Sequence, residues 1–353
     1  MRRSFVRRCG IVLAVLALPV LLIGTGASAA PKTNKLASAT LNGDGSTFQL
    51  GFNQVVIGAF KPVQKAVTIN YQGNGSGQGR TDFVNGIVDF AGTDAAYKPT
   101  DPQPPKPFFY FPTVVAPITV SYNLSDVSKL KLSGDTIAKI FSGAVTTWDD
   151  AAIKADNPSA KLPSTKITVV HRSESSGTTA NFTSFLTKAA PSSWTLGSGS
   201  TVSWPSSTQG ATGNSGVAKA VKDTDGAIGY VDFSDANASG LTFAAVKNSS
   251  GKYIAPNLAS AAAAAQGATV NADLTFDPIN ATGPAAYPIT SPTWIIVYQD
   301  QSDASKGAAV KAFLNYIYAD GQKLASSVDY APLPKALLKQ AKAQVNKITV
   351  PAA

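Results

Sequence analysis

The sequence predicts an α/β protein of two lobes, with mixed sheets flanked by helices and two crossover strands at the hinge. Short β-like runs are repeatedly followed by Gly- and Ser-rich loops that open helices, which is the pattern of βα units. Two long β-rich runs that contain prolines, residues 108–122 and 287–298, suit strands that pass between lobes. With 353 residues, 44% of them hydrophobic, the chain can bury a sizeable core in about two domains. We expect lobe 1 to span residues 38–116 and 290–350, and lobe 2 to span 117–289.

Residues 1–29 have the features of a secretory signal peptide. A basic start precedes an apolar run at 11–23, and Ala27-Ser28-Ala29 is a small-residue cleavage site. The apolar run is too short to span a membrane. Because the opening arginines also resemble a twin-arginine signal, the export route stays open. Cys9 precedes the apolar run and is not the cysteine of a lipid anchor, so we expect a soluble protein of the periplasm, with secretion as the alternative.

The formal net charge is +9, and four of these charges lie in the expected leader, which leaves roughly +5 on the rest of the chain. The lysines are scattered, without a basic patch interleaved with aromatics, so nucleic-acid binding is not expected. Cys9 is the only cysteine and His171 the only histidine. This excludes intrachain disulfides, Cys/His zinc sites and any nucleophile–histidine pair beyond the one that His171 could serve. We expect neither a metal nor a cofactor.

In the first lobe, a Gly-rich loop joins a strand to a helix. The strand covers 39–41, the loop 42–48 and the helix 49–61, with Ser46 or Thr47 expected as the helix cap.

A second loop of this kind, residues 72–80, follows a strand at 67–71 and opens a helix that contains Phe83. Its glycines permit close approach of the backbone to a ligand, and Ser76 is the expected cap. The spacing differs from G-x-G-x-x-G and no Walker lysine follows, so neither a dinucleotide site nor a P-loop is indicated.

A buried strand at 88–92 ends in Thr93 and Asp94. An acid just beyond the carboxyl end of a strand stands where open α/β sheets place their ligands. The alternative is that Asp94 caps a following helix. A Pro-rich connector, residues 98–107, then leads into the first crossover run.

The stretch 167–186 suits an anion site. Residues 167–170 form a β-like run, and apolar residues at helical spacing begin at Phe182. Ser176 is a good N-cap, and the helix start leaves N–H groups free at the positive end of the helix dipole. Arg172 adds a permanently charged, two-pronged donor, so we expect this loop to hold a small oxyanion. The alternative is an ordinary capped helix with a surface arginine.

Further elements complete the two lobes. In order they are a helix capped by Ser133, a loop and helix start at 213–221, a turn and strand at 225–231, an Ala-rich helix at 257–266 that Gly267 ends, and helices at about 305–318 and 335–344.

Together these segments resemble the periplasmic phosphate-binding proteins of high-affinity phosphate ABC transporters, over nearly all of the chain that follows the leader. One such segment would be weak support, but six or more in order and at similar spacing are strong. The segments are 43–48, 71–76, 88–95, 148–150, 172–178, 226–231 and 287–291.

The resemblance implies a type II periplasmic binding-protein fold that closes on one phosphate ion. The ligand residues it implies are Thr47, Phe48, Ser76, Asp94, Arg172, Ser176, Gly177 and Thr178, with Ser46 and Glu174 in support. Phe48 would contribute its backbone N–H, and Asp94 would accept a proton from the phosphate. Glu174 stands where the family usually has Asp, which leaves open how it braces the arginine.

The resemblance also implies a monomer that is not an enzyme and that delivers phosphate to the permease subunits and ATPase of an ABC importer. Phosphate near neutral pH carries a proton for Asp94 and sulfate carries none, so Asp94 is the predicted filter between them. Three alternatives stay open: a secreted phosphatase with Ser176 or Ser76 as nucleophile, a binding protein for sulfate or molybdate, and an adhesive or surface-layer protein. A phosphatase would need an activating base or a metal cluster.

Overall fold

The computed structural model describes residues 36–352, so the expected leader, Cys9 included, lies outside the described residues. In lobe 1, the strands β1 (Ala39–Gly45), β2 (Val67–Gln72) and β3 (Phe90–Thr93) are parallel, with β1 in the middle. The helix α1 (Leu50–Phe60) follows β1, and α2 (Ser76–Val84) follows β2. Since the strands are parallel, the loops that follow them lie at one edge of the sheet.

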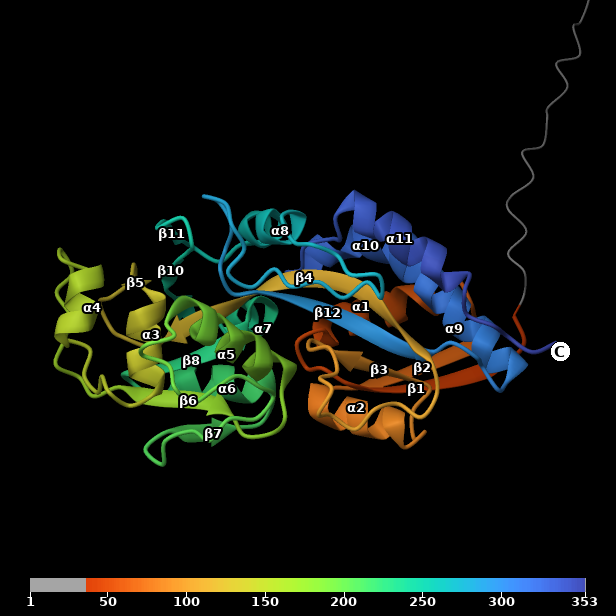
Figure 1. Ribbon diagram of the computed structural model, residues 1–353, viewed down its shortest axis with the longest axis horizontal. Helices are drawn as coiled ribbons and strands as arrows, with labels where there is room; N and C mark the ends of the chain where they lie inside the picture. The colour runs from red at the N-terminus through yellow and green to blue at the C-terminus, as the bar shows by residue number, and fades with distance from the viewer. Residues whose placement is uncertain (1–35, 353) are drawn as a thin grey trace, which may run out of the picture. The chain divides into compact units, whose positions relative to one another are not determined.

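Two long strands run through the middle of the fold (Figure 1). They are β4 (Phe108–Tyr122) and β12 (Thr290–Tyr298), which pair antiparallel to each other. β12 also pairs with β3, and the last five residues of β4 pair with β8 (Ala227–Asp232). The ladder therefore continues from lobe to lobe in the order β2-β1-β3-β12-β4-β8-β6-β7, and the mixed sheets of the two lobes share β4.

Lobe 2 repeats the strand, loop and helix pattern. Its strand β6 (Thr168–Arg172) is parallel to both β8 and β7 (Gln209–Ala211). The helices that follow these strands are α5 (Gly177–Ala189), α6 (Gly213–Asp223) and α7 (Phe233–Ala238).

Smaller elements lie around this lobe. They are β9 (Thr242–Phe243), which pairs with β4, the helices α3 (Gly134–Phe141) and α4 (Ala151–Asp156), and a sheet of β5 (Lys131–Leu132), β10 (Ala245–Lys247) and β11 (Tyr253–Ile254).

The later helices include the Ala-rich α8 and a group near the carboxyl end of the chain. They are α8 (Leu258–Gln266), α9 (Ala304–Tyr316), the π-helix η1 (Ile317–Gly321), α10 (Gln322–Leu324), the 3₁₀-helix η2 (Ala325–Val328) and α11 (Lys335–Val345). The α9–α11 group lies on the lobe 1 side in Figure 1, so this lobe draws on both ends of the described chain.

Some predicted helix caps are confirmed and others are wrong. The hydroxyls of Ser133 and Ser176 accept hydrogen bonds from N–H groups in the first turns of α3 and α5. Neither Ser46 nor Thr47 caps α1, whose N-cap residue is Gln49, and Gly75 takes the N-cap position of α2 in place of Ser76. The physical reason is that these hydroxyls are engaged in tertiary contacts, described below.

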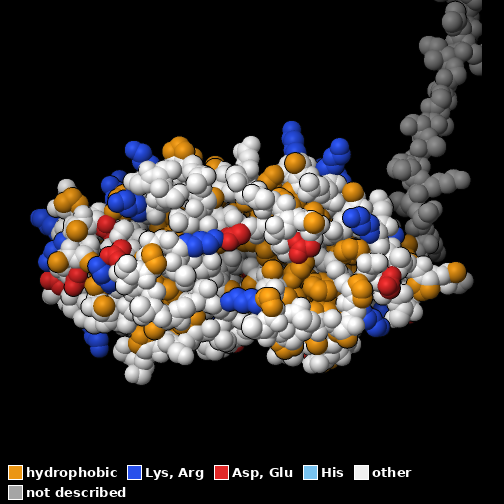
Figure 2. Space-filling view, in the orientation of Figure 1, with side chains coloured by type: hydrophobic (Ala, Val, Ile, Leu, Met, Phe, Trp, Pro, Cys, Tyr) orange, Lys and Arg blue, Asp and Glu red, His pale blue; other side chains and the backbone are white. Residues whose placement is uncertain are grey.

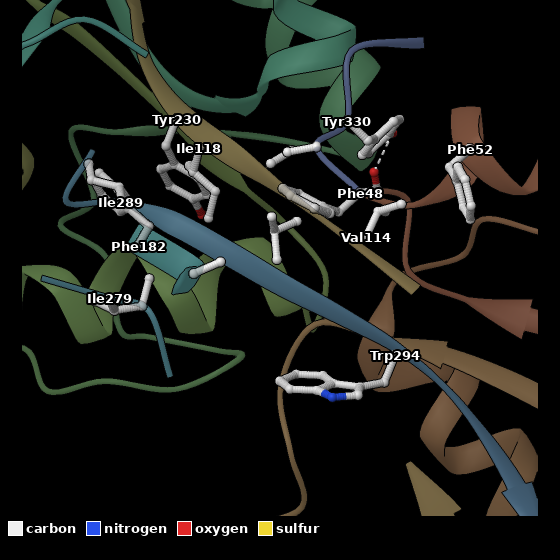
Figure 3. Packing of buried hydrophobic residues seen from close by; sticks show 14 of the residues in the cluster. Phe48, Phe52, Val114, Ile118, Phe182, Tyr230, Ile279, Ile289, Trp294 and Tyr330 are labelled. Carbon is white, nitrogen blue, oxygen red and sulfur yellow. Dashed lines mark hydrogen bonds between the residues drawn. The ribbon is translucent and has the colours of Figure 1, made fainter. Parts of the chain in front are cut away.

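The hydrophobic core extends on both sides of the crossover strands (Figure 3). Ile118 and Phe182 pack on the lobe 2 side, and Val114, Phe48 and Tyr330 on the lobe 1 side, all of them buried. The Tyr330 hydroxyl donates to the Phe48 carbonyl oxygen at 2.6 Å, which fixes the loop between β1 and α1.

On the surface, lysines and arginines alternate with acidic side chains over the face shown in Figure 2, without a patch of a single sign. Among residues 36–352, no helix combines the length and the apolar character that a membrane crossing requires.

Candidate functional site

Loops from both lobes meet at the beginning of α5. Gly177, the first residue of α5, lies so near lobe 1 that a Cβ on it would stand 2.5 Å from Ser76 Oγ and 2.6 Å from Asp94 Oδ2. Glycine is therefore the residue that permits this approach. Ser76 begins α2 and Asp94 follows β3, so the structure brings predicted residues of the two lobes together here.

The Asp94 carboxylate is buried, with 2% of the residue exposed, and it accepts hydrogen bonds from hydroxyl groups. Ser46 Oγ lies 2.6 Å from both carboxylate oxygens, Thr293 Oγ1 lies 2.6 Å from Oδ1, and Ser76 Oγ lies 3.2 Å from Oδ2. The Gln49 amide donates to Thr293 Oγ1 at 2.8 Å, which turns the threonine proton toward Asp94. No helix lies between β3 and β4, so the alternative in which Asp94 caps a helix is wrong.

Burial raises the pKa of the Asp94 carboxyl above its ordinary value. The hydroxyl groups of Ser46, Thr293 and Ser76 and the charge of Arg172 act in the opposite direction. Thr293 contacts Oδ1 only, and Oδ2 is the oxygen that faces the start of α5. A carboxylate in such a dry position is suited to accept a hydrogen bond from a protonated ligand oxygen.

Arg172, the last residue of β6, is buried, so the alternative of a surface arginine is wrong. Its side chain is 1% exposed. Nη1 donates to Thr178 Oγ1 at 3.3 Å, and Nε and Nη2 both donate to Glu174 Oε1, Nε at 2.8 Å. The backbone N–H of Arg172 donates to the Tyr230 hydroxyl at 3.0 Å. These contacts fix the guanidinium beside the first turn of α5.

Glu174 braces Arg172 through one oxygen only. Oε1 accepts both guanidinium bonds and the Gly213 N–H at 3.0 Å, whereas Oε2 is buried without a partner among residues 36–352. Burial by itself would raise the pKa of Glu174, but the hydrogen bond and the charge of Arg172 outweigh it and lower the pKa. The brace is therefore a charge-assisted hydrogen bond to an ionised carboxylate.

Four backbone N–H groups of the predicted set donate to no acceptor within the described part of the chain. They belong to Phe48, Ser76, Gly177 and Thr178. Unpaired buried N–H groups are rare in native proteins, and those at a helix start lie at the positive end of the helix dipole. Ser176 stands before two of them, and its Oγ accepts the N–H of Thr179 at 3.2 Å.

Two buried asparagines connect the lobes around this point. Asn181 Nδ2 donates to the Asp94 carbonyl oxygen at 2.7 Å. Asn214 Nδ2 lies 3.0 Å from Thr47 Oγ1, in lobe 1, and 3.2 Å from Thr178 Oγ1, in lobe 2. The two lobes are thus hydrogen-bonded to each other at this point.

The sequence prediction missed Thr293, Asn181 and Asn214 as members of this cluster. Asn214 lies in a loop and helix start of the same type as the others, which is a usable signal. Thr293 is a polar residue in a β-rich crossover run and is fully buried. Asn181 lies one turn inside α5, and nothing in its local sequence marks it.

The only histidine and the acidic residues form no metal site in residues 36–352, where no group of three His, Cys, Asp or Glu side chains could hold an ion. His171 stacks on Trp204, with ring centroids 4.9 Å apart, and its Nδ1 lies 2.9 Å from the Arg172 carbonyl oxygen. Neither contact directs the imidazole to a serine of the cluster.

The cluster therefore combines N–H donors, hydroxyls, one guanidinium and one carboxylate in a buried place between two lobes. Fixed donors of this kind replace the water around an anion, since a buried charge without partners is costly. The single carboxylate is favourable only for an anion that still carries a proton.

Comparison with known proteins gives a family match over most of the chain. A model described as a PBP superfamily domain matches residues 30–321. The phosphate-binding protein PstS of Xylella fastidiosa (strain 9a5c) is 35% identical over 324 residues, which cover 89% of this chain and 86% of that protein. The phosphate-binding protein PstS 2 of Mycobacterium tuberculosis (strain ATCC 25618 / H37Rv) is also 35% identical over 324 residues, which cover 88% of this chain and 87% of that protein.

Solved structures share the fold. A high-affinity periplasmic phosphate-binding protein, PfluDING, determined with bound phosphate at pH 8.5, has a TM-score of 0.71 at 24% identity, covering 89% of this chain and 100% of that one. The phosphate-binding protein of Stenotrophomonas maltophilia has a TM-score of 0.67 at 23% identity, and the match covers 87% of this chain and 94% of that one.

Proposed function

The chain belongs to the PBP superfamily and, within it, to the PstS phosphate-binding proteins, and on this basis we propose that it binds inorganic phosphate between its lobes. The resemblance noted in the sequence is thereby confirmed at the level of the family. The observation that carries the proposal is the convergence of Arg172, the free N–H groups at the start of α5 and the buried Asp94.

In the proposed mode, the N–H groups of Phe48, Ser76, Gly177 and Thr178 donate to phosphate oxygens. Hydroxyl groups of Thr47, Ser176 and Thr178 and the guanidinium of Arg172 complete the donor set, and the hydroxyl of Ser76 would turn from Asp94 to the phosphate. Ser46 and Glu174 hold Asp94 and Arg172 in place. Asp94 accepts a hydrogen bond from a protonated phosphate oxygen. Sulfate, fully deprotonated near neutral pH, would leave this carboxylate facing like charge.

The division into lobes at 38–116 with 290–350, and at 117–289, is part of the proposal. The strands β4 and β12 pair Pro117 with Thr290, so both proposed boundaries fall at one point of the ladder. Ligand that contacts both lobes favours the closed arrangement, with this point as the hinge. The closed form would then present phosphate to the permease subunits of an ABC importer outside the cytoplasm, with the protein acting as a monomer.

Calorimetric titration of the purified protein, freed of phosphate, with phosphate, arsenate and sulfate tests the proposal. We expect phosphate to bind and sulfate to be rejected. Preferential binding of sulfate, or no binding of any of these oxyanions, would refute it. The same preparation is incubated with a chromogenic phosphate ester, because sustained release of the chromophore would support the phosphatase alternative instead.

A further inference from the structure

Asn214, outside the proposed ligand set, stands between two of its threonines. It is the second residue of α6 and is fully buried. Its Nδ2 lies 3.0 Å from Thr47 Oγ1 and 3.2 Å from Thr178 Oγ1, so each amide hydrogen has one threonine as acceptor. Its Oδ1 lies 3.4 Å from the backbone N of Asp232. That N–H needs an acceptor, which favours the orientation with the NH₂ group toward the threonines.

The threonine hydroxyls have a fixed capacity of one donated and two accepted hydrogen bonds. Thr178 Oγ1 accepts from Asn214 and from Arg172 Nη1 at 3.3 Å, so both of its lone pairs are engaged. Thr47 Oγ1 accepts from Asn214. Within residues 36–352, neither hydroxyl donates to a protein acceptor. Both protons are therefore available for a ligand.

We infer that Asn214 is a positioning residue that orients the hydroxyl protons of Thr47 and Thr178 toward the bound anion. The inference rests on the proposed function. A carboxamide NH₂ can only donate, so it prevents either threonine from turning its proton toward α6. The two threonines come from different lobes, so Asn214 can orient both hydroxyl protons only when the lobes are together. The anion then contacts two hydroxyl groups that already point toward it.

The replacement Asn214→Asp tests this with almost no change of shape. A carboxylate accepts where the amide donated, so it would draw both threonine protons away from the anion, and it would also add a negative charge. We expect phosphate affinity to fall by about 100-fold or more. Ser215→Asp, which places a carboxylate on the next, exposed residue, is the control for charge and should change affinity by less than about threefold.

A double-mutant cycle separates proton orientation from charge. In the Thr47→Val, Thr178→Val background there are no hydroxyl protons to turn, so Asn214→Asp should cost only the charge effect, about tenfold or less. The same fold loss in both backgrounds would overturn the inference. If circular dichroism shows that Asn214→Asp does not fold, Asn214→Ala replaces it in the same cycle. We expect Asn214→Ala to lower phosphate affinity by about tenfold in the wild-type background and not to lower it in the valine background.

The wild-type titration distinguishes this failure from that of the proposed function. Wild-type protein that binds phosphate, with an additive cycle, refutes the role of Asn214 alone. Wild-type protein that binds no phosphate refutes the proposed function, and the positioning role with it.

Discussion

Asp94→Asn is the most direct test of how the site would separate phosphate from sulfate. In the structure, Oδ1 lies 2.6 Å from the hydroxyls of Thr293 and Ser46, whereas Oδ2, also 2.6 Å from the Ser46 hydroxyl, faces Ser76 and the start of α5. An asparagine keeps its oxygen at the two hydroxyl donors and places its NH₂ group where Oδ2 stood. The variant therefore exchanges an acceptor for a donor at one point of the site without changing its shape.

The expected magnitude follows from the burial of Asp94. Sulfate in the wild-type site offers no proton to Asp94 and places a second anion beside this buried carboxylate, and losing one partner of a buried charge costs about 3–5 kcal/mol. At 1.4 kcal/mol for each factor of ten, this is about three orders of magnitude in affinity. We expect Asp94→Asn to raise sulfate affinity by about 100-fold or more and to change phosphate affinity by less than about tenfold.

The assay is calorimetry at pH 7 with both anions, read as the ratio of the two dissociation constants. Asp232→Asn is the matched control, because Asp232 is also buried, at 1% exposed. Its contact with the site is made by its backbone N–H, which donates to Asn214 Oδ1 and which the substitution keeps. It should leave the ratio unchanged. Equal exclusion of sulfate by the wild-type protein and by Asp94→Asn would show that the carboxylate is not the filter.

Further predictions concern closure, stability and the arginine. Small-angle scattering should show a smaller radius of gyration after phosphate is added, and an unchanged radius would count against closure. Burial raises the pKa of Asp94, so ionisation of this carboxyl destabilises the phosphate-free fold. The free-energy penalty is absent below the unfolded pKa and is complete once the pH has risen through the folded pKa. Asp94→Asn without ligand should therefore melt higher than wild type at pH 7, by about 1–2 °C for each kcal/mol, and at about the same temperature as wild type near pH 4; a lower melting temperature at pH 7 would contradict this. Arg172→Lys, which loses the planar fork, should weaken phosphate binding by about 100-fold in calorimetry, and unchanged affinity would exclude Arg172 as a ligand. Glu174→Gln, which removes the charge from the hydrogen bond to Arg172, should lower phosphate affinity by about tenfold, whereas Glu174→Asp should change it by less than about threefold. Equal losses of phosphate affinity would show that the shape of residue 174, not its charge, matters.

The order of strands, loops and helices could be predicted from the sequence because each is marked locally. Glycine and serine at helix starts, such as the Ser176 cap of α5, and the β-rich crossover runs have signals within a few residues. The expectation that the loop after β6 binds an anion follows from the same signals, since an arginine beside free N–H groups is a local property.

Which hydroxyl bonds to which partner was decided only by the tertiary structure. Ser46 and Ser76 look like helix caps, yet both turn to Asp94, because a buried carboxylate without hydrogen-bond donors is costly. Thr293 and Asn214 join the cluster from positions 199 and 167 residues away from their partners Asp94 and Thr47. No local pattern carries such contacts, because they arise when the crossover strands bring the two lobes together.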